Sequence, residues 1–208
     1  MSVMLDVIFS MIMGGMLLLN ILRAQDLVYE NSSTYQGDVL VQEMLITQVQ
    51  YVEGELRNMG YGLAQGIPAI LAAGDSSVTF LMDMGRNGTI DTLTYSLGPV
   101  SELSRTQNEM DRYLRRTITM PGVGTDQSNA GVVTYFHLRY LEATLDTLAT
   151  PVSVADLPRI SEIEVSMEVQ NPYALYRPQG MVATGERNAL YSTSYWQQTR
   201  LASQNFRR

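Results

Sequence analysis

The sequence predicts an α+β protein in which a long hydrophobic N-terminal helix and an amphipathic helix precede an antiparallel β-sheet. Three observations predict this class: an apolar run at residues 3–22, helical periodicity at 38–59, and short alternating segments from 78 to 202. Because no helical pattern separates the strands, we expect the second helix to cover an antiparallel sheet. The chain then has two parts, a hydrophobic helix at 1–30 that serves as membrane anchor or filament core, and a globular region at 31–208.

The first element is the apolar run at 3–22, in which Asp6 is the one charged residue and which Arg23 follows directly. Twenty residues at 1.5 Å each span about 30 Å, the thickness of the hydrocarbon core of a membrane. A cleavable secretory signal is disfavoured, because no basic residue precedes the run and residues 23–26 are a poor cleavage site. Two alternatives remain, a plain membrane anchor and a helix that leaves the membrane to pack inside a filament.

Asp6 is the residue that bears on this choice. A carboxylate inside an apolar helix is costly, and such residues usually have a specific partner. In a bundle of identical helices, Asp6 would pair with the N-terminal ammonium of a neighbouring chain and set the axial register. The alternative is that Asp6, because it is so near the end of the helix, lies among lipid headgroups. The residues expected to pack in the core of such a bundle are Val3, Leu5, Val7, Phe9, Gly14, Gly15, Leu17 and Leu18.

The second element is an amphipathic helix at 38–59. The polar stretch 31–37 is expected to break the first helix, and Asp38 is a suitable N-cap for the second. Apolar residues then recur at spacings of three and four, which indicates one face directed to a core. A Gly-Tyr-Gly sequence at 60–62 is expected to end the helix. The apolar face consists of Val41, Leu45, Val49, Val52, Leu56 and Met59.

The strands are predicted from alternation and from turn residues. Asn87-Gly88 is a strong hairpin signal between two alternating segments. The clearest strand has Ile163, Val165, Met167 and Val169 on one face and Glu162, Glu164, Ser166 and Glu168 on the other. The predicted strands are 78–84, 93–97, 132–141, 162–169 and 191–201. The predicted surface loops are 121–131 and 171–187, and the segment 101–119 has no clear pattern.

Composition excludes several kinds of chemistry. The chain has no cysteine, so disulfides, thiolate nucleophiles and cysteine-ligated zinc are absent, and a single histidine, His137, makes a histidine-based site hard to assemble. The net charge of −7 makes nucleic acid an unfavourable partner. We therefore expect a protein that is not an enzyme. The enzymatic alternative is a carboxylate-dependent hydrolase, which would need Asp83 and Asp91 together with a glutamate of the strand 162–169.

The hairpin at 83–91 carries the one candidate metal site. Oxygen ligands occur there at Asp83, Asn87, Thr89 and Asp91, and glycines supply the turn, as in calcium loops. A calcium loop usually has three or more carboxylates, however, and only two are present. Since an Asn-Gly hairpin needs no metal, calcium is the less favoured alternative and no cofactor is expected.

The order of these elements resembles that of type IV pilins and of the pseudopilins of type II secretion, most of all the PilW and GspJ group of minor pilins. An acid stands fifth from Ser2, and residues 14–19 are similar to the family's glycine-then-leucine stretch. Residues 54–62 resemble that group's helix end, and residues 83–95 resemble its hairpin. The resemblance covers about the first hundred residues.

The resemblance implies a pilin-like fold and a structural subunit of a type IV pilus-like or pseudopilus-like helical filament. N-terminal helices would bundle in the core, and the globular parts would form the surface. The implied partners are other copies of the chain or other pilin-like subunits. The implied location is the inner membrane before assembly and an extracellular or periplasmic filament afterwards. The alternative is a solitary membrane-tethered binding or adhesion domain.

The sequence departs from the family pattern at two points. The acid is aspartate, where the family has glutamate. The family's leader ends in glycine before the cleaved bond, whereas Met1 precedes Ser2 here. Either the numbering omits the leader or a prepilin peptidase does not process this chain.

Overall fold

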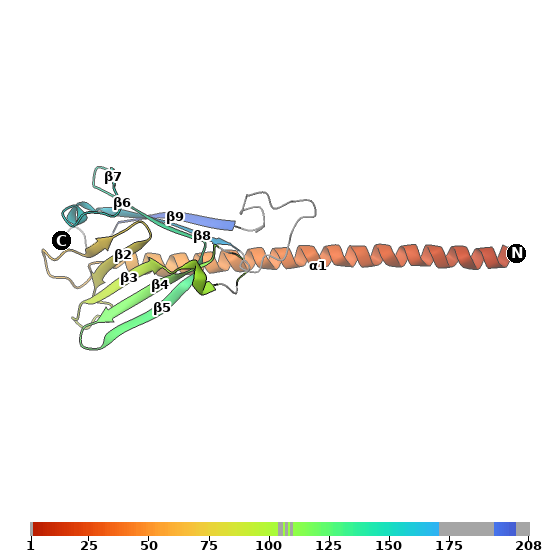
Figure 1. The fold of residues 1–208 in the computed structure, drawn as a ribbon, viewed down its shortest axis with the longest axis horizontal. Coiled ribbons are helices and arrows are strands. Elements are labelled where there is room, and N and C mark those ends of the chain that lie inside the picture. The colour runs from red at the N-terminus through yellow and green to blue at the C-terminus, as the bar shows by residue number, and fades with distance from the viewer. Residues whose placement is uncertain (1, 104–105, 107, 109, 171–193, 203–208) are drawn as a thin grey trace. The chain divides into compact units, whose positions relative to one another are not determined.

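The protein is an α+β chain in which a long, initially apolar helix precedes antiparallel strands, as the sequence predicts (Figure 1). The structure, a computed structural model, describes residues 2–103, 106, 108, 110–170 and 194–202. Contacts divide the chain into two compact units, Met1–Leu40 and Val41–Arg208. We call the second unit the head domain.

The helix α1 runs without interruption from Ser2 to Arg57, so the predicted break at 31–37 and the separate helix beginning at Asp38 are wrong. The stretch contains no proline, and its Asn, Ser, Thr and Gly residues each cost a helix only about 1 kcal/mol or less relative to alanine. Gln36 Nε2 also donates to Ser32 Oγ one turn earlier, at 3.3 Å. A polar segment of this kind can remain helical when the residues on both sides of it are helical.

The last turns of α1 belong to the head domain, and their apolar face is the predicted one. All six residues of the 41–59 pattern are buried: Val41, Leu45, Val49, Val52, Leu56 and Met59. The glycines at 60–62 end the helix as expected, since Gly60 and Gly62 have φ of 79° and 81°. A Cβ on Gly62 would lie 2.6 Å from Cβ of Asp83, so the chain also needs glycine there for close packing.

The strands form two sheets, not the single sheet expected. Sheet A has the order β1-β2-β3-β4-β5 and sheet B has the order β7-β6-β8-β9, and the paired strands are antiparallel. The strands of sheet A are β1 (Ile70–Ala73), β2 (Ser77–Met82), β3 (Asp91–Leu97), β4 (Arg112–Met120) and β5 (Gly124–Val133). Those of sheet B are β6 (Tyr135–Leu141), β7 (Thr147–Leu148), β8 (Glu162–Gln170) and β9 (Ser194–Leu201). The described residues also form two 3₁₀ helices, η1 (Val100–Leu103) and η2 (Leu157–Arg159).

Two predictions about strands need correction. The predicted strand 132–141 is divided at Thr134, so that its start belongs to β5 in sheet A and the rest forms β6 in sheet B. The predicted loop 121–131 is mostly β5, which pairs with β4 along its whole length. Because β5 is an edge strand with six exposed residues at its start, it lacks the apolar alternation that would have identified it. The segment 101–119, for which no prediction was made, supplies η1 and most of β4.

The other strand predictions are confirmed where the structure describes them. The hairpin at 83–91 joins β2 to β3, and β8 directs Ile163, Val165, Met167 and Val169 into the core. β9 is described from Ser194 onward, so the predicted start at 191 lies outside the described residues, as does the predicted loop 171–187.

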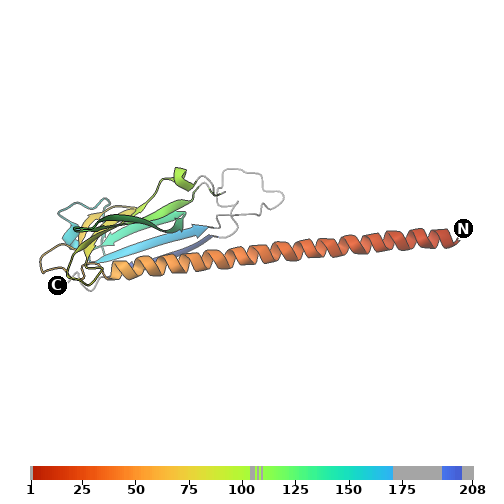
Figure 2. The same ribbon diagram turned by 90° about the horizontal axis from the view of Figure 1, so that it is seen from below.

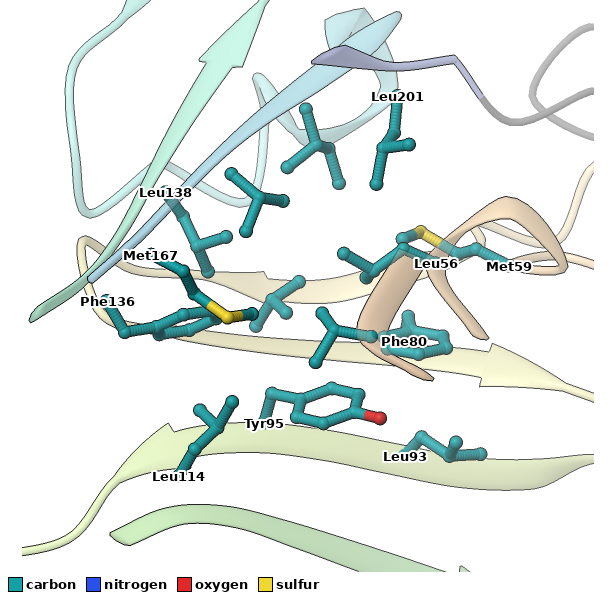
Figure 3. Packing of buried hydrophobic residues seen from close by; sticks show 14 of the residues in the cluster. Leu56, Met59, Phe80, Leu93, Tyr95, Leu114, Phe136, Leu138, Met167 and Leu201 are labelled. Atoms are coloured by element: carbon teal, nitrogen blue, oxygen red, sulfur yellow. The ribbon is translucent and has the colours of Figure 1, made fainter. Parts of the chain in front are cut away.

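One hydrophobic core joins the end of α1 to both sheets. Figure 2 shows the last turns of α1 beside β8 and β9, and Val49, Val52, Val165 and Met167 line one small cavity there. Figure 3 shows Leu56 of α1 and Phe80, Tyr95 and Leu138 of the sheets directed into a common interior. Each large apolar side chain buried in this way contributes about 1.5–3 kcal/mol.

A buried polar cluster fixes α1 to sheet A within this core. Arg116 Nε donates to both carboxylate oxygens of Glu55, at 3.0 and 2.9 Å, and its Nη2 donates to Oε1 at 2.5 Å. The hydroxyl of Tyr95 donates to Oε2 of Glu55 at 2.5 Å. Burial raises the pKa of Tyr95, and the bond to Glu55 acts in the same direction. Burial alone would lower the pKa of Arg116, but its bonds to Glu55 outweigh this and raise it.

We predict that Glu55→Ala lowers the free energy of unfolding of the head domain by about 3–5 kcal/mol, because it leaves the Arg116 guanidinium buried without its partner. The control is Glu53→Ala, which removes an exposed pair with Arg57 and should cost less than about 1 kcal/mol. Urea titration of the full chain in detergent, followed by near-ultraviolet circular dichroism, measures both. Equal losses in the two variants would show that the buried cluster does not stabilise the head domain.

Candidate membrane and assembly segment

The first candidate site is the apolar part of α1, Val3–Tyr29, which we call the apolar segment. It has 27 residues, and none of its most apolar stretch is buried inside the structure. At 1.5 Å per residue it is about 40 Å long, which exceeds the hydrocarbon core of a bilayer. By length and composition, then, the segment is able to cross a membrane, although a secretory signal sequence meets the same criteria.

The residues predicted to pack in a helical bundle lie in this segment, and all are exposed. The least exposed of the predicted large side chains, Val7, is 51% accessible. Nothing lies within 4 Å of a Cβ built on Gly14 or Gly15. The exposed large apolar residues include Val3, Leu5, Val7, Phe9, Leu17 and Leu18. A helix that is apolar on every face needs surroundings of lipid or protein, and the described part of the chain supplies none for this segment.

Asp6 is exposed on the same segment, among apolar neighbours. Within the described residues its carboxylate has no hydrogen bond and no ion pair. The nearby Ser10 hydroxyl is satisfied locally, because it donates to the carbonyl oxygen of Val7 at 2.9 Å.

The second candidate site, the β2–β3 loop, is held by its own carboxylates. Asp83 accepts the backbone N–H of Asn87 on Oδ1 at 3.0 Å and that of Gly88 on Oδ2 at 2.9 Å. Asn87 Oδ1 accepts the N–H of Thr89 at 2.8 Å, and Asp91 Oδ2 accepts the N–H of Met84 at 3.3 Å. Asp83 and Asp91 are both 6% exposed. Three of the four side chains proposed as metal ligands, those of Asp83, Asn87 and Asp91, thus act as acceptors that shape the loop.

The calcium prediction stays a prediction. The structure brings Asp83, Asn87, Thr89 and Asp91 into one loop, as the sequence suggested. Among the described residues, no three His, Cys, Asp or Glu side chains form a group that could hold a metal ion. The present arrangement is explained by the backbone hydrogen bonds alone.

The acids required by the hydrolase alternative are not gathered in one site. Asp83 follows the end of β2 and Asp91 begins β3, whereas Glu164 lies on sheet B, where Arg139 and Arg200 bind it. Asp111, whose pKa is raised by burial and only partly lowered again by Thr106, is 1% exposed. A group so fully covered is out of reach of a substrate.

Two arginines of β4 have partners within the head domain. Arg116 binds Glu55, and Arg115 forms an ion pair with Glu102. The cluster around Glu55 was not predicted. Its only sequence signal is a glutamate close to the apolar face of an amphipathic helix, and its partners lie 40 and 61 residues away along the chain.

Comparisons with protein-family models, with curated proteins and with solved structures give no match.

We predict that Leu17→Arg releases the chain from membranes, because an arginine at the centre of a spanning helix raises the free energy of insertion by about 3 kcal/mol. The control is Val28→Arg, near the C-terminal end of the same segment, where a long cationic side chain can reach the interface. Alkaline carbonate extraction of membranes from expressing cells measures the retained fraction. Full retention of Leu17→Arg would contradict a span centred on this segment.

We also predict that Asp83→Ala destabilises the head domain by about 2–3 kcal/mol, because two backbone N–H groups lose a charged acceptor. The loss should be equal in calcium and in a chelator, if the carboxylate serves only the loop. Thermal unfolding of wild type and variant in both buffers measures this. A wild-type stability that rises with calcium, and a variant that does not respond, would support the metal site.

Proposed function

We propose that this chain is a structural subunit of a type IV pilus-like or pseudopilus-like helical filament, with a pilin-like fold. N-terminal helices bundle in the filament core, and head domains form its surface. The observation that supports this most is the apolar segment, which is exposed on every face and in which Asp6 is the one charged residue between positions 3 and 22. A membrane covers this surface before assembly, and neighbouring copies cover it afterwards.

Asp6 supplies the register in this proposal. Helices that exchange lipid for protein gain no hydrophobic energy, because lipid tails are as apolar as leucine, so packing and polar contacts must select the arrangement. A single carboxylate in an otherwise apolar bundle favours the one axial offset at which it meets a cation. Along the helix axis, the cation nearest to Asp6 is the N-terminal ammonium, and we propose that Asp6 meets the ammonium of a neighbouring copy.

Small and adaptable residues support close packing in the same region. Gly14 and Gly15 leave open space on the helix surface, where another backbone can approach. Methionines at 4, 11, 13 and 16 are unbranched and fit neighbours of differing shape. The proposed partners are copies of this chain or other pilin-like subunits. The proposed locations are the inner membrane and then an extracellular or periplasmic filament.

A second candidate function is that of a solitary membrane-tethered binding or adhesion domain. The same exposed helix favours it, because one apolar helix is sufficient for anchoring. The two functions differ in what they require of Asp6: a tether does not need it, whereas a filament does.

We predict that Asp6→Ala abolishes assembly and leaves the head domain folded. Removing one member of a buried ion pair costs about 3–5 kcal/mol, so filament yield should fall by far more than about tenfold. Asp6→Glu keeps the charge and should retain filaments, and Asp26→Ala is the control for loss of an exposed acid further along α1. Negative-stain electron microscopy of material sheared from cells measures yield, and circular dichroism confirms folding.

Filaments of normal yield from Asp6→Ala would remove Asp6 from the mechanism. A wild-type chain that stays in the membrane fraction without filaments would contradict the subunit proposal and favour the tether.

A further inference from the structure

Sheet B has one face in the core and one face in solvent, and the solvent face carries an unusual set of side chains. The strand registers place its residues in three rows across β6, β8 and β9. Phe136, Leu138 and Tyr140 of β6 point into the core, so the alternate residues point outward. We call this the sheet B outer face: Tyr135, Glu168 and Trp196; His137, Ser166 and Gln198; Arg139, Glu164 and Arg200.

The first row exposes two large aromatic side chains. Trp196 is 68% accessible and Tyr135 is 47% accessible, and Trp196 is the only tryptophan of the chain. Their strands flank β8 at a spacing of about 4.8 Å each, so the backbones of the two residues lie about 10 Å apart with Glu168 between them. Aromatic side chains bury about 150–250 Å² each when covered. Their exposure to water here is therefore unfavourable.

The third row exposes positive charge. Arg139 Nη1 and Arg200 Nε donate to the two oxygens of Glu164, at 2.9 and 2.8 Å. Burial alone would raise the pKa of Glu164, but the hydrogen bonds from Arg200 and Gln198 and the charge of Arg139 lower it. The Glu164 side chain is 1% exposed, whereas the two arginines are 45% and 56% exposed. Solvent therefore meets two guanidinium groups that are held in place by a covered carboxylate.

The middle row lies between these two ends and has an acid beside it. His137 Nδ1 lies 2.9 Å from Oδ1 of Asp75, and the His137 ring lies 5.9 Å from that of Tyr135. The face as a whole thus combines tryptophan, tyrosine and arginine on three hydrogen-bonded strands. These three residue types are the ones most enriched where protein interfaces gain their energy.

We propose that the sheet B outer face is the contact between neighbouring head domains, and that its partner is an acidic surface on a second copy of this chain. This inference rests on the proposed filament. Charge complementarity favours the second copy, because the chain carries a net charge of −7 and the exposed ends of Arg139 and Arg200 are positive. Helical assembly joins two different surfaces of successive copies, so the arginine end of this face on one copy meets an acidic surface on the next.

The single tryptophan makes the proposal measurable in wild-type protein. Fluorescence of the chain dispersed in detergent is compared with that of filaments identified by electron microscopy, and acrylamide and iodide are the quenchers. We expect Trp196 to be readily quenched in the dispersed chain, and to show blue-shifted emission with several-fold weaker quenching in filaments. Equal quenching in both states would overturn the proposal and would leave this face outward, available to another protein or to a glycan.

A variant tests the same face by function. Trp196→Ser should shorten filaments or abolish them, with the fold unchanged by circular dichroism. The matched control is Val154→Ser, which removes an 82% exposed apolar side chain outside this face and should leave filaments normal. Normal filaments from Trp196→Ser would overturn this proposal while the filament proposal stands. An absence of filaments in the wild type would instead overturn the filament proposal, and this contact with it.

Discussion

The apolar surface of α1 is the constraint from which the rest of the molecule can be understood. A helix whose residues 3–29 are largely apolar and are exposed within the described part of the chain cannot stay in water, because each of its large side chains would gain about 1.5–3 kcal/mol on being covered. The later part of the same helix meets this requirement internally, since the two sheets cover its patterned face. The earlier part has no such pattern and needs a membrane or other chains. The later part of α1 thus has its apolar side chains buried within the chain, whereas the earlier part needs a membrane or other chains to bury them.

The head domain is joined to α1 by more than apolar contact. Hydrophobic packing alone tolerates small shifts of a helix along or about its axis, whereas the bonds of Glu55 to Arg116 and Tyr95 have one satisfactory geometry. The two glycines at the helix end add a second constraint, because Gly62 packs against Asp83, which in turn holds the β2–β3 loop. The end of the helix, sheet A and this loop therefore determine one another's positions. The surface residues of the head domain therefore keep fixed positions relative to the end of α1. Both the filament proposal and the proposed contact between head domains require this.

The sequence predicts those parts of the fold in which local pattern and final environment agree. The six buried positions from Val41 to Met59 and the alternation in β8 were predicted residue by residue, because a single face of each element enters the core. Prediction fails where the environment is set by distant residues. β5 is polar because it lies at a sheet edge, and the division of 132–141 at Thr134 depends on two sheets meeting there. The helix break at 31–37 was expected from residue preferences that are individually too weak to stop a long helix. The residues of the apolar segment were identifiable from sequence, but the cluster at Glu55 and the rows of sheet B need strand register, which spacing along the chain does not reveal.

The two proposed contacts, the helix bundle with Asp6 and the contact between head domains, would have different roles in assembly. Helix packing in an apolar interior supplies a large contact with little selectivity, because lipid and leucine offer similar surroundings. Asp6 adds selectivity along the axis, since a misplaced carboxylate remains without a cation in a medium that solvates it poorly. Rotation of one copy about another is left open by a helix that is apolar on every face, so a contact between head domains has to fix it. A sheet face with aromatic residues at one end and arginines at the other is suited to that purpose, because the two ends distinguish its orientations. The register of the helices and the orientation of the heads would then be set by different residues, which lie on different units of the chain.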